Sequence, residues 1–162
     1  MKKDMIRVAT HIPLLVRAFT QSEGDVLEMG TGYFSTLILR WLCEMSGRTL
    51  YSFEGSKGWY ERALKKSKPF HKLIYAPDWD KTDIERHWGL VFIDHGPNWR
   101  RHIDIKRLVN FADYIVIHDT EPESDKAYHY SRIFPLFKYK YDFNKYKPWT
   151  SVVSNFKDVT KW

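Results

Sequence analysis

Short apolar runs alternate along most of the chain with segments in which apolar residues recur at helical spacing. The runs have the length of strands, and turn residues such as Gly47 and Pro69 separate many of the segments. The expected strands are 25–29, 50–53, 72–75, 90–93 and 114–117, and the expected helices are 11–21, 34–45, 57–67, 99–110 and 126–134. This alternation predicts an α/β fold in which a mostly parallel sheet carries helices on both faces.

The C-terminal part of the chain has a different pattern. Residues 138–143 alternate Lys with Tyr, Asp and Phe, residues 150–156 read as a second strand, and a Lys-Pro turn lies between them. We therefore expect an antiparallel hairpin at this end of the sheet. Its Lys and Tyr side chains could bind single-stranded nucleic acid. The favoured interpretation is an edge strand whose lysines prevent aggregation.

Helical spacing also predicts which side chains face the core. The expected inward residues are Ile12, Leu14, Leu15 and Phe19 in the first helix, and Leu37, Ile38, Trp41 and Leu42 in the second. Cys43 lies in the same apolar stretch and is expected to be a small buried residue. It is the only cysteine, which excludes an intrachain disulfide and a cysteine-based zinc site.

Length and charge narrow the class of protein. The 162 residues are expected to form one domain, 1–162, and 43% of them are hydrophobic. The net charge of +6 permits an anionic partner such as nucleic acid, although a solvated basic surface is the more common explanation. Arg17 interrupts the apolar run near the N-terminus, so we expect no membrane span and a cytoplasmic protein.

Each of the five expected parallel strands ends in an acidic residue or is soon followed by one. These residues are Glu28, Glu54, Asp78, Asp94 and Asp119. In an open α/β sheet, ligands bind beyond the carboxyl ends of the strands, so all five acids are expected at one cleft. A single acid in this position often caps the next helix or turn. Five in succession favour a shared functional site.

The stretch VLEMGTGYFST, residues 26–36, is typical of a strand, a tight turn and the start of a helix. It contains no GKS or GKT, which excludes a nucleoside triphosphate loop, and Ser35 takes the third place of the dinucleotide fingerprint. Glu28 would repel a pyrophosphate but suits a cationic amino group or a sulfonium. Glu54 follows Gly32 by about 22 residues, a spacing at which an acid accepts hydrogen bonds from ribose hydroxyls. A ribose with a positive charge and no phosphate describes S-adenosylmethionine.

Four segments carry a resemblance to a known family. VLEMGTGYFSTLIL, SFEGSKGWYERA, VFIDHGPNWRRHIDIKRL and YIVIHDTEP resemble, in this order, the motifs of a branch of the class I S-adenosylmethionine-dependent methyltransferases. The similarity covers residues 25–121 and implies a Rossmann-like methyltransferase sheet with a C-terminal antiparallel hairpin. It also implies O-methylation of a small-molecule or sugar-like acceptor. The sequence departs from the family at His95, which stands where a glycine is usual.

The resemblance implies roles for particular residues. The implied cofactor-binding residues are Glu28, Gly30, Gly32, Tyr33, Glu54, Gly55, Trp59, Asp78 and Asp94. Glu28 and the two loop glycines would hold the methionine part and Glu54 the ribose. Trp59 would stack near the adenine, with Asp78 at its edge.

An oxygen acceptor needs a base or a metal to lower its pKa. Asp94, His95 and Asp119 are the predicted catalytic residues. Asp94 and Asp119 match two positions at which related sugar and catechol O-methyltransferases bind Mg²⁺, so they are the predicted metal ligands. His118 is either a further ligand or a histidine hydrogen-bonded to a carboxylate.

The chain is short, so its acceptor pocket is expected to be shallow or completed by a second subunit or a partner. Three other functions stay open. The altered motif at His95 would also suit an inactive cofactor-binding subunit. A nucleic-acid methyltransferase is less favoured because no N-P-P-Y or D-P-P-Y tetrad follows the fourth strand. A nicotinamide oxidoreductase is least favoured because of Glu28.

Overall fold

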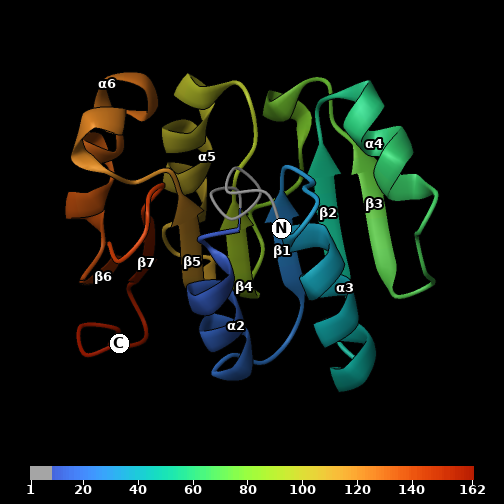
Figure 1. Cartoon of the computed structure of the whole chain (residues 1–162), viewed down its shortest axis with the longest axis horizontal. Helices are drawn as coiled ribbons and strands as arrows, with labels where there is room; N and C mark the ends of the chain where they lie inside the picture. Colours follow the sequence, from blue (N-terminus) through green and yellow to red (C-terminus); the bar gives the residue numbers. More distant parts are fainter. Residues whose placement is uncertain (1–8) are drawn as a thin grey trace.

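The computed structural model describes residues 9–162 and contains one seven-stranded sheet with the order β3-β2-β1-β4-β5-β7-β6 (Figure 1). The strands are β1 Val26–Met29, β2 Leu50–Glu54, β3 His71–Tyr75, β4 Trp88–Ile93, β5 Ala112–His118, β6 Tyr139–Phe143 and β7 Thr150–Ser154. Strands β1 to β5 pair in parallel, and β7 runs antiparallel to both β5 and β6. The predicted mostly parallel sheet and its C-terminal antiparallel hairpin are confirmed.

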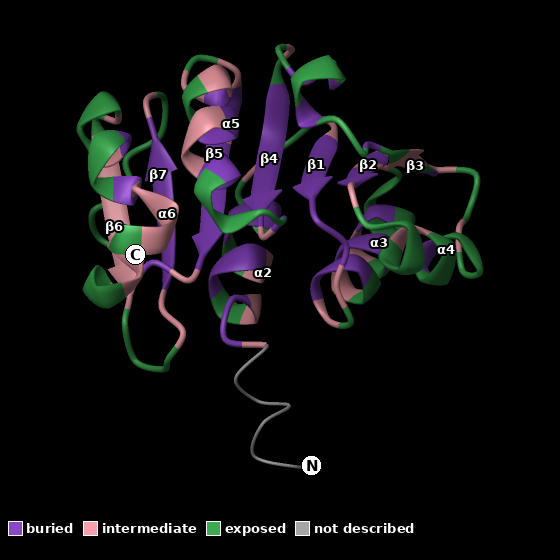
Figure 2. Ribbon diagram, turned by 90° about the horizontal axis from the view of Figure 1, so that it is seen from above, coloured by how far each residue is buried: buried purple, intermediate pink, exposed green. Residues whose placement is uncertain are grey.

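Helices cover both faces of the sheet. The α-helices are α2 Ile12–Thr20, α3 Ser35–Ser46, α4 Lys57–Leu64, α5 Arg101–Leu108 and α6 Asp125–Tyr128. Helices α2, α3 and α4 lie on one side of the sheet and α5 lies on the other (Figure 2). Within residues 9–162, five short 3-10 helices connect the elements: η1 Trp79–Lys81, η2 Asn98–Arg100, η3 Pro122–Ser124, η4 Tyr130–Arg132 and η5 Phe134–Leu136.

The helix predicted for 126–134 was wrong in length. Helix α6 ends at Tyr128 because His129 adopts a left-handed conformation with φ of 57°. The chain then continues through η4 and η5, and Pro135 near the start of η5 prevents a longer helix. The segment still packs inward, since Tyr130 and Ile133 belong to the core.

The core has two layers, one on each face of the sheet. Leu90 and Phe92 of β4 pack toward the cluster that contains α2 and α3, whereas Val91 and Ile93 pack toward the cluster that contains α5. All six residues of β4 are buried, which explains why this strand reads as a nearly continuous apolar run. Trp88 at its start is 1% exposed and donates its indole N–H to the carbonyl of Ile84 at 2.8 Å.

The inward face predicted for α3 is confirmed for Ile38 and Leu42, which are half-buried and pack against the core, and it was wrong for Leu37 and Trp41. Leu37 and Trp41 are 60% and 56% exposed, and Leu39 and Cys43 fill the core instead. The charged residue Arg40 is also buried on the inward face of α3. Its guanidinium donates to Nδ1 of His71 and to the carbonyl of Ala63, two contacts that the apolar pattern does not reveal. Burial of Cys43 is confirmed.

In helix α2 the prediction is largely confirmed. Leu14, Leu15 and Phe19 are buried, and Ile12 at the helix start is half-buried. No helix within residues 9–162 combines the length and the apolar character that crossing a membrane requires.

Candidate functional site

A cavity of about 1170 Å³ opens at the carboxyl ends of β1, β2 and β4. It is lined by residues 30–35, 54–56 and 94–96, together with His11 and Trp59. Its volume slightly exceeds the range of about 300–1,000 Å³ typical of small-molecule sites, so a cofactor leaves room for an acceptor. The predicted cleft at this edge of the sheet is therefore present, but it does not include all five acids.

The loop after β1 depends on Gly30. This residue has a φ of +88°, and an added Cβ atom would lie 2.6 Å from Cα of His95. The loop therefore passes directly over the end of β4, and only a glycine allows that approach. The amide of Gly30 donates to the carbonyl of Phe53, which fixes the loop to β2 as well.

Glu28 lies beneath this loop rather than in the cavity. It is fully buried and accepts hydrogen bonds from the hydroxyls of Thr36 at 2.9 Å and Ser52 at 2.6 Å. The Thr36 oxygen in turn accepts the amide of Gly32 at 2.8 Å. The sequence predicted that Glu28 contacts the methionine part of a cofactor. The structure instead places its carboxylate beneath the loop and outside the cavity lining. It holds the loop through Thr36.

Burial raises the pKa of Glu28 to about 7, although its hydroxyl donors oppose the shift. A carboxyl group whose pKa rises on folding stabilises the protein below its unfolded value, near 4.5, and that contribution is lost as the pH rises through 7. Glu28→Gln cannot ionise. We therefore expect the difference in unfolding free energy between this variant and wild type to change in favour of the variant by about 2–3 kcal/mol as the pH rises from 5 to 8.

Urea unfolding of both proteins at several pH values measures this difference. Glu61→Gln on the exposed side of α4 is the matched control for the substitution itself. A constant difference between Glu28→Gln and wild type from pH 5 to pH 8 would contradict the raised pKa.

Glu54, at the end of β2, does line the cavity. One carboxylate oxygen accepts both the amide and the hydroxyl of Thr31 at 2.7 Å. The other accepts the amide of Ser56 at 2.7 Å and keeps a lone pair for one more donor. The carboxylate is therefore fixed in orientation and can accept a ligand hydroxyl.

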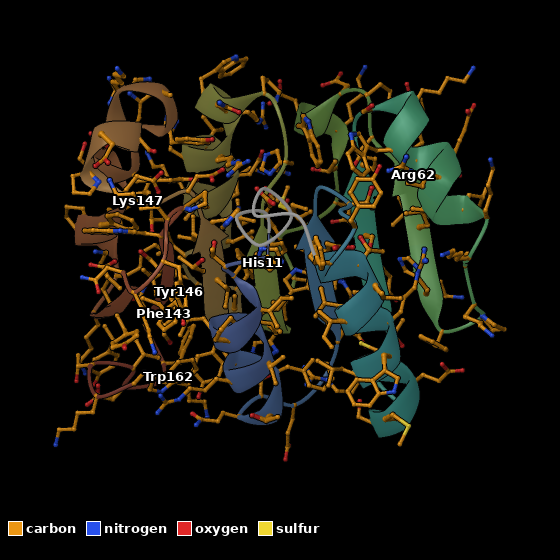
Figure 3. All side chains as sticks on the ribbon, viewed as in Figure 1. His11, Arg62, Phe143, Tyr146, Lys147 and Trp162 are labelled. Atoms are coloured by element: carbon orange, nitrogen blue, oxygen red, sulfur yellow. The ribbon has the colours of Figure 1, made fainter. Side chains whose placement is uncertain are left out.

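Two aromatic rings form a wall beside Glu54. The rings of Tyr33 and Trp59 meet edge to face with centroids 5.0 Å apart, and both residues line the cavity with Gly55. The guanidinium of Arg62 on α4 lies 4.2 Å from the Tyr33 ring centre and 4.9 Å from that of Trp59, and so steadies the pair (Figure 3). This wall can hold a flat ring such as adenine.

Asp78 lies outside the cavity, contrary to the prediction that it approaches the adenine. It is exposed, accepts the amide of Asp80 at 3.1 Å and pairs with Lys81 at 3.0 Å. These contacts cap the 3-10 helix η1. The common structural role of an acid after a strand applies here.

Arg101 joins the acids at the ends of β4 and β5. Its guanidinium donates to Asp94 at 2.9 Å and to Asp119 at 3.1 Å, and it also donates to the carbonyl of His95 at 2.7 Å. Asp94 lines the cavity, whereas Asp119 accepts the Tyr128 hydroxyl at 3.0 Å and is not part of the lining. Burial alone would raise the pKa of Asp94, but the hydrogen bond with His118 and the charge of Arg101 hold it below its usual value.

The predicted Mg²⁺ site at Asp94 and Asp119 is not supported by this arrangement. Mg²⁺ requires a nearly octahedral set of oxygen ligands. Between these two carboxylates the structure places the guanidinium of Arg101, which pairs with both of them. The guanidinium therefore occupies the position of an ion that bridges Asp94 and Asp119.

The ring of His95 does not face the acceptor space. Its side chain is 0% exposed, its Nε2 lies 3.0 Å from a carboxylate oxygen of Asp104, and its ring packs on Trp79 at 4.3 Å. The backbone of His95 passes beneath Gly30 at the cavity wall. The prediction that His95 is an acceptor-facing catalytic side chain is therefore corrected: the ring joins the loop after β4 to helix α5.

His118 is the histidine hydrogen-bonded to a carboxylate, one of the two roles expected for it. Its Nδ1 lies 3.4 Å from Asp94 and 3.5 Å from Asp119, and its Nε2 lies 3.1 Å from the hydroxyl of Thr10. Burial alone would lower the pKa of His118, but the hydrogen bond with Asp94 and the charges of both acids raise it above its usual value.

His11 is a cavity residue that sequence reasoning missed. It precedes α2 (Figure 3), is 2% exposed and lines the cavity, as Asp94 does. Its ring centre is 4.9 Å from that of His118. No local motif marks His11, because only the packing of α2 against β4 and β5 brings it to the strand ends.

The comparisons with known proteins identify the fold. No protein-family model matches this sequence, and no curated protein matches it. Among solved structures, the O-methyltransferase TomG from Streptomyces achromogenes, in complex with S-adenosylmethionine, superposes with a TM-score of 0.63 and 14% identity over 91% of this chain and 79% of its own. An S-adenosylmethionine-dependent O-methyltransferase from Thermotoga maritima gives a TM-score of 0.65 and 12% identity, with 91% of this chain and 64% of that one covered.

A human methyltransferase 10 domain containing protein gives a TM-score of 0.60 and 12% identity, with 93% of this chain and 84% of that one covered. Identities this low establish the fold alone. The chain therefore has the Rossmann-like methyltransferase fold that the four sequence segments indicated.

Proposed function

We propose that this chain is an S-adenosylmethionine-dependent methyltransferase that methylates a hydroxyl group of a small-molecule or sugar-like acceptor. The observation that carries the proposal is that the backbone amides of the loop after β1 already donate hydrogen bonds within the protein. Its amides at Gly30, Thr31 and Gly32 donate to Phe53, Glu54 and Thr36 respectively. A phosphate-binding loop needs such amides free, so this loop suits a nucleoside cofactor without phosphate.

The cavity offers a contact for each part of that cofactor. Glu54 would accept a ribose hydroxyl with its remaining lone pair, and the wall of Tyr33 and Trp59 would hold the adenine. Gly30 and Gly32 would hold the methionine part, and Asp94 and His11 line the same cavity. When bound, the cofactor supplies an electrophilic methyl group on a sulfonium.

The chain's own residues orient the acceptor and accept a hydrogen bond from its hydroxyl group. Methyl transfer is an in-line displacement, so alignment of the acceptor oxygen with the methyl group carries much of the catalysis. Asp94 is the carboxylate at the cavity, and its lowered pKa keeps it ionised to accept a hydrogen bond from the acceptor hydroxyl. Asp119 acts as a positioning residue, because it reaches Asp94 only through Arg101.

A nucleic-acid acceptor is the second candidate function. A smaller cavity of about 420 Å³ adjoins the cofactor wall and shares Tyr33 and Trp59 with it. Four cationic side chains line this cavity: Arg40, Arg62, Lys65 and Lys66. Cationic groups next to aromatic rings are typical of sites for single-stranded nucleic acid. The hairpin strand β6 adds little support, because its residues are all half-buried and Lys140 pairs with Asp142.

The test is the affinity for S-adenosylhomocysteine, measured by calorimetry and by thermal unfolding. A ligand at about 100 times its dissociation constant stabilises the folded chain by about 2.7 kcal/mol. We expect this stabilisation with S-adenosylhomocysteine but not with NAD, whose pyrophosphate finds no free loop amides. Stabilisation by NAD alone would contradict the proposed cofactor.

Glu54→Gln examines the ribose contact directly. A hydrogen bond to a charged group contributes about 1.5–3 kcal/mol, so the variant is expected to bind S-adenosylhomocysteine at least tenfold more weakly. Asp78→Asn, outside the cavity, is the matched control and should bind like wild type. Wild-type affinity in Glu54→Gln would contradict the ribose assignment. Binding without methyl transfer to any hydroxyl acceptor would instead favour the inactive cofactor-binding subunit.

A further inference from the structure

We propose that His11, Asp94 and His118 form a binding site for a divalent transition cation of the Zn²⁺ type at the acceptor end of the cavity. One donor atom of each residue lies within 4.8 Å of the other two. The three residues come from the start of α2, the end of β4 and the end of β5. This set differs from the Asp94 and Asp119 pair of the sequence prediction, and it offers two nitrogens and one oxygen.

The first argument is that His11 is buried without a hydrogen-bond partner in the described part of the chain. Both of its ring nitrogens are inaccessible, and neither forms a hydrogen bond with a residue of the described range 9–162. A neutral imidazole carries one N–H donor and one lone pair, and leaving such groups unsatisfied in a protein interior costs about 1–3 kcal/mol each. A metal bond to one nitrogen would give that lone pair a partner.

The second argument is the orientation of the His118 ring. The hydroxyl of Thr10 donates its hydrogen to the carbonyl of Pro148 at 2.7 Å, so its oxygen accepts from Nε2 of His118 at 3.1 Å. This bond places the N–H of a neutral His118 on Nε2 and a bare lone pair on Nδ1. That lone pair faces carboxylate oxygens of Asp94 at 3.4 Å and Asp119 at 3.5 Å.

A lone pair and two carboxylates repel one another unless a cation lies among them. That cation is either a proton on Nδ1 or a metal ion. Histidine ligands of metals commonly donate their second ring nitrogen to an oxygen, as His118 does to Thr10. The additional nitrogen of His11 distinguishes the two cases, because a proton on His118 leaves both ring nitrogens of His11 without a partner, whereas a metal bond satisfies one of them.

The charges and ligand types indicate the class of metal. Asp94 and Asp119 carry two negative charges and Arg101 one positive charge, so a divalent ion meets a net negative site. Imidazole nitrogens suit Zn²⁺ and similar ions, whereas Mg²⁺ prefers oxygen ligands. Bonds of about 2.0–2.1 Å require the three side chains to approach one another more closely than they do in the absence of an ion.

Three protein ligands would leave a fourth position of a tetrahedral ion for another group, as in catalytic zinc sites. Two of the three ligands, His11 and Asp94, line the cavity. A hydroxyl group bound there would lose its proton more easily. This role in activating the acceptor rests on the proposed function, whereas cation binding does not depend on it. The two can therefore be tested separately.

The experiment is a titration of the purified, metal-free chain with Co²⁺, followed by visible absorption, and with Zn²⁺, followed by calorimetry. No cofactor is added. We expect one ion per chain, Co²⁺ absorption bands characteristic of a four- or five-coordinate site, and no displacement by millimolar Mg²⁺. His11→Leu and His118→Leu should each weaken binding at least tenfold. His87→Leu removes an exposed histidine that pairs with Asp113 and should leave binding unchanged.

His11→Asp keeps a metal-binding atom at the same place, so it should retain Co²⁺ with altered bands. It also guards against loss of binding through misfolding, which circular dichroism of each variant checks. Wild-type affinity in His11→Leu, or the absence of stoichiometric Co²⁺ binding to the wild-type chain, would overturn the proposal and leave a protonated His118 as the partner of Asp94. Affinity for S-adenosylhomocysteine, measured on the same metal-free protein, tests the proposed function independently.

Discussion

Replacing Arg101 with methionine is expected to lower the free energy of unfolding by about 3–5 kcal/mol at pH 7. Arg101 is 4% exposed and donates to Asp94, Asp119 and the carbonyl of His95. Methionine fills a similar space but leaves the carboxylates of Asp94 and Asp119 without the guanidinium that pairs with both of them. Removing one partner of a buried ion pair is strongly destabilising because the remaining charge stays buried.

Urea unfolding followed by circular dichroism measures this effect. Arg62→Met is the matched control, because Arg62 lies over two rings near the surface and should contribute about 1 kcal/mol at most. The double variant Arg101→Met with Asp119→Asn should recover part of the loss, since it removes one of the two unpaired charges. A loss below about 1 kcal/mol in Arg101→Met would show that solvent already screens the acids.

Much of the fold could be predicted from the sequence because its strands differ clearly from its helices. Strand β4 is buried on both faces, so its apolar run is nearly continuous and easy to recognise. The face of α3 could not be predicted in the same way. Thr36 is buried there with a hydrogen bond to Glu28 of β1 and Arg40 with one to His71 of β3, and an apolar pattern contains no such information.

The candidate site was predictable where a backbone feature determines it. Gly30 and Glu54 follow strands and reach the cavity as expected. Glu28 does not reach the cavity. Alternate residues of a strand face opposite sides of the sheet, and Glu28 faces α3 rather than the end of the strand. His11 could not be found at all, since its neighbours in the site come from β4 and β5.

The most sensitive position of the cofactor loop is expected to be Gly30. In Gly30→Ala, the backbone keeps a positive φ that costs an L-residue about 1–2 kcal/mol. The new Cβ atom would also lie 2.6 Å from Cα and 2.7 Å from the amide nitrogen of His95, a backbone contact that no rotamer change can relieve. Overpacking of this kind costs about 1–3 kcal/mol more. We therefore expect a total loss of about 2–5 kcal/mol in unfolding free energy.

The same change should weaken cofactor binding beyond its effect on stability. Relief of the clash requires the loop to move away from the end of β4, and this displaces the amide of Thr31 that orients the Glu54 carboxylate. Gly58→Ala in α4 is the matched control, because its Cβ would meet no atom within 4 Å and alanine favours the helix by up to about 1 kcal/mol. Calorimetry with S-adenosylhomocysteine, at a temperature where both variants remain folded, should show at least tenfold weaker binding for Gly30→Ala alone. Equal affinity in both variants would mean that the loop does not contact the ligand, and the cofactor would then have to bind elsewhere in the cavity.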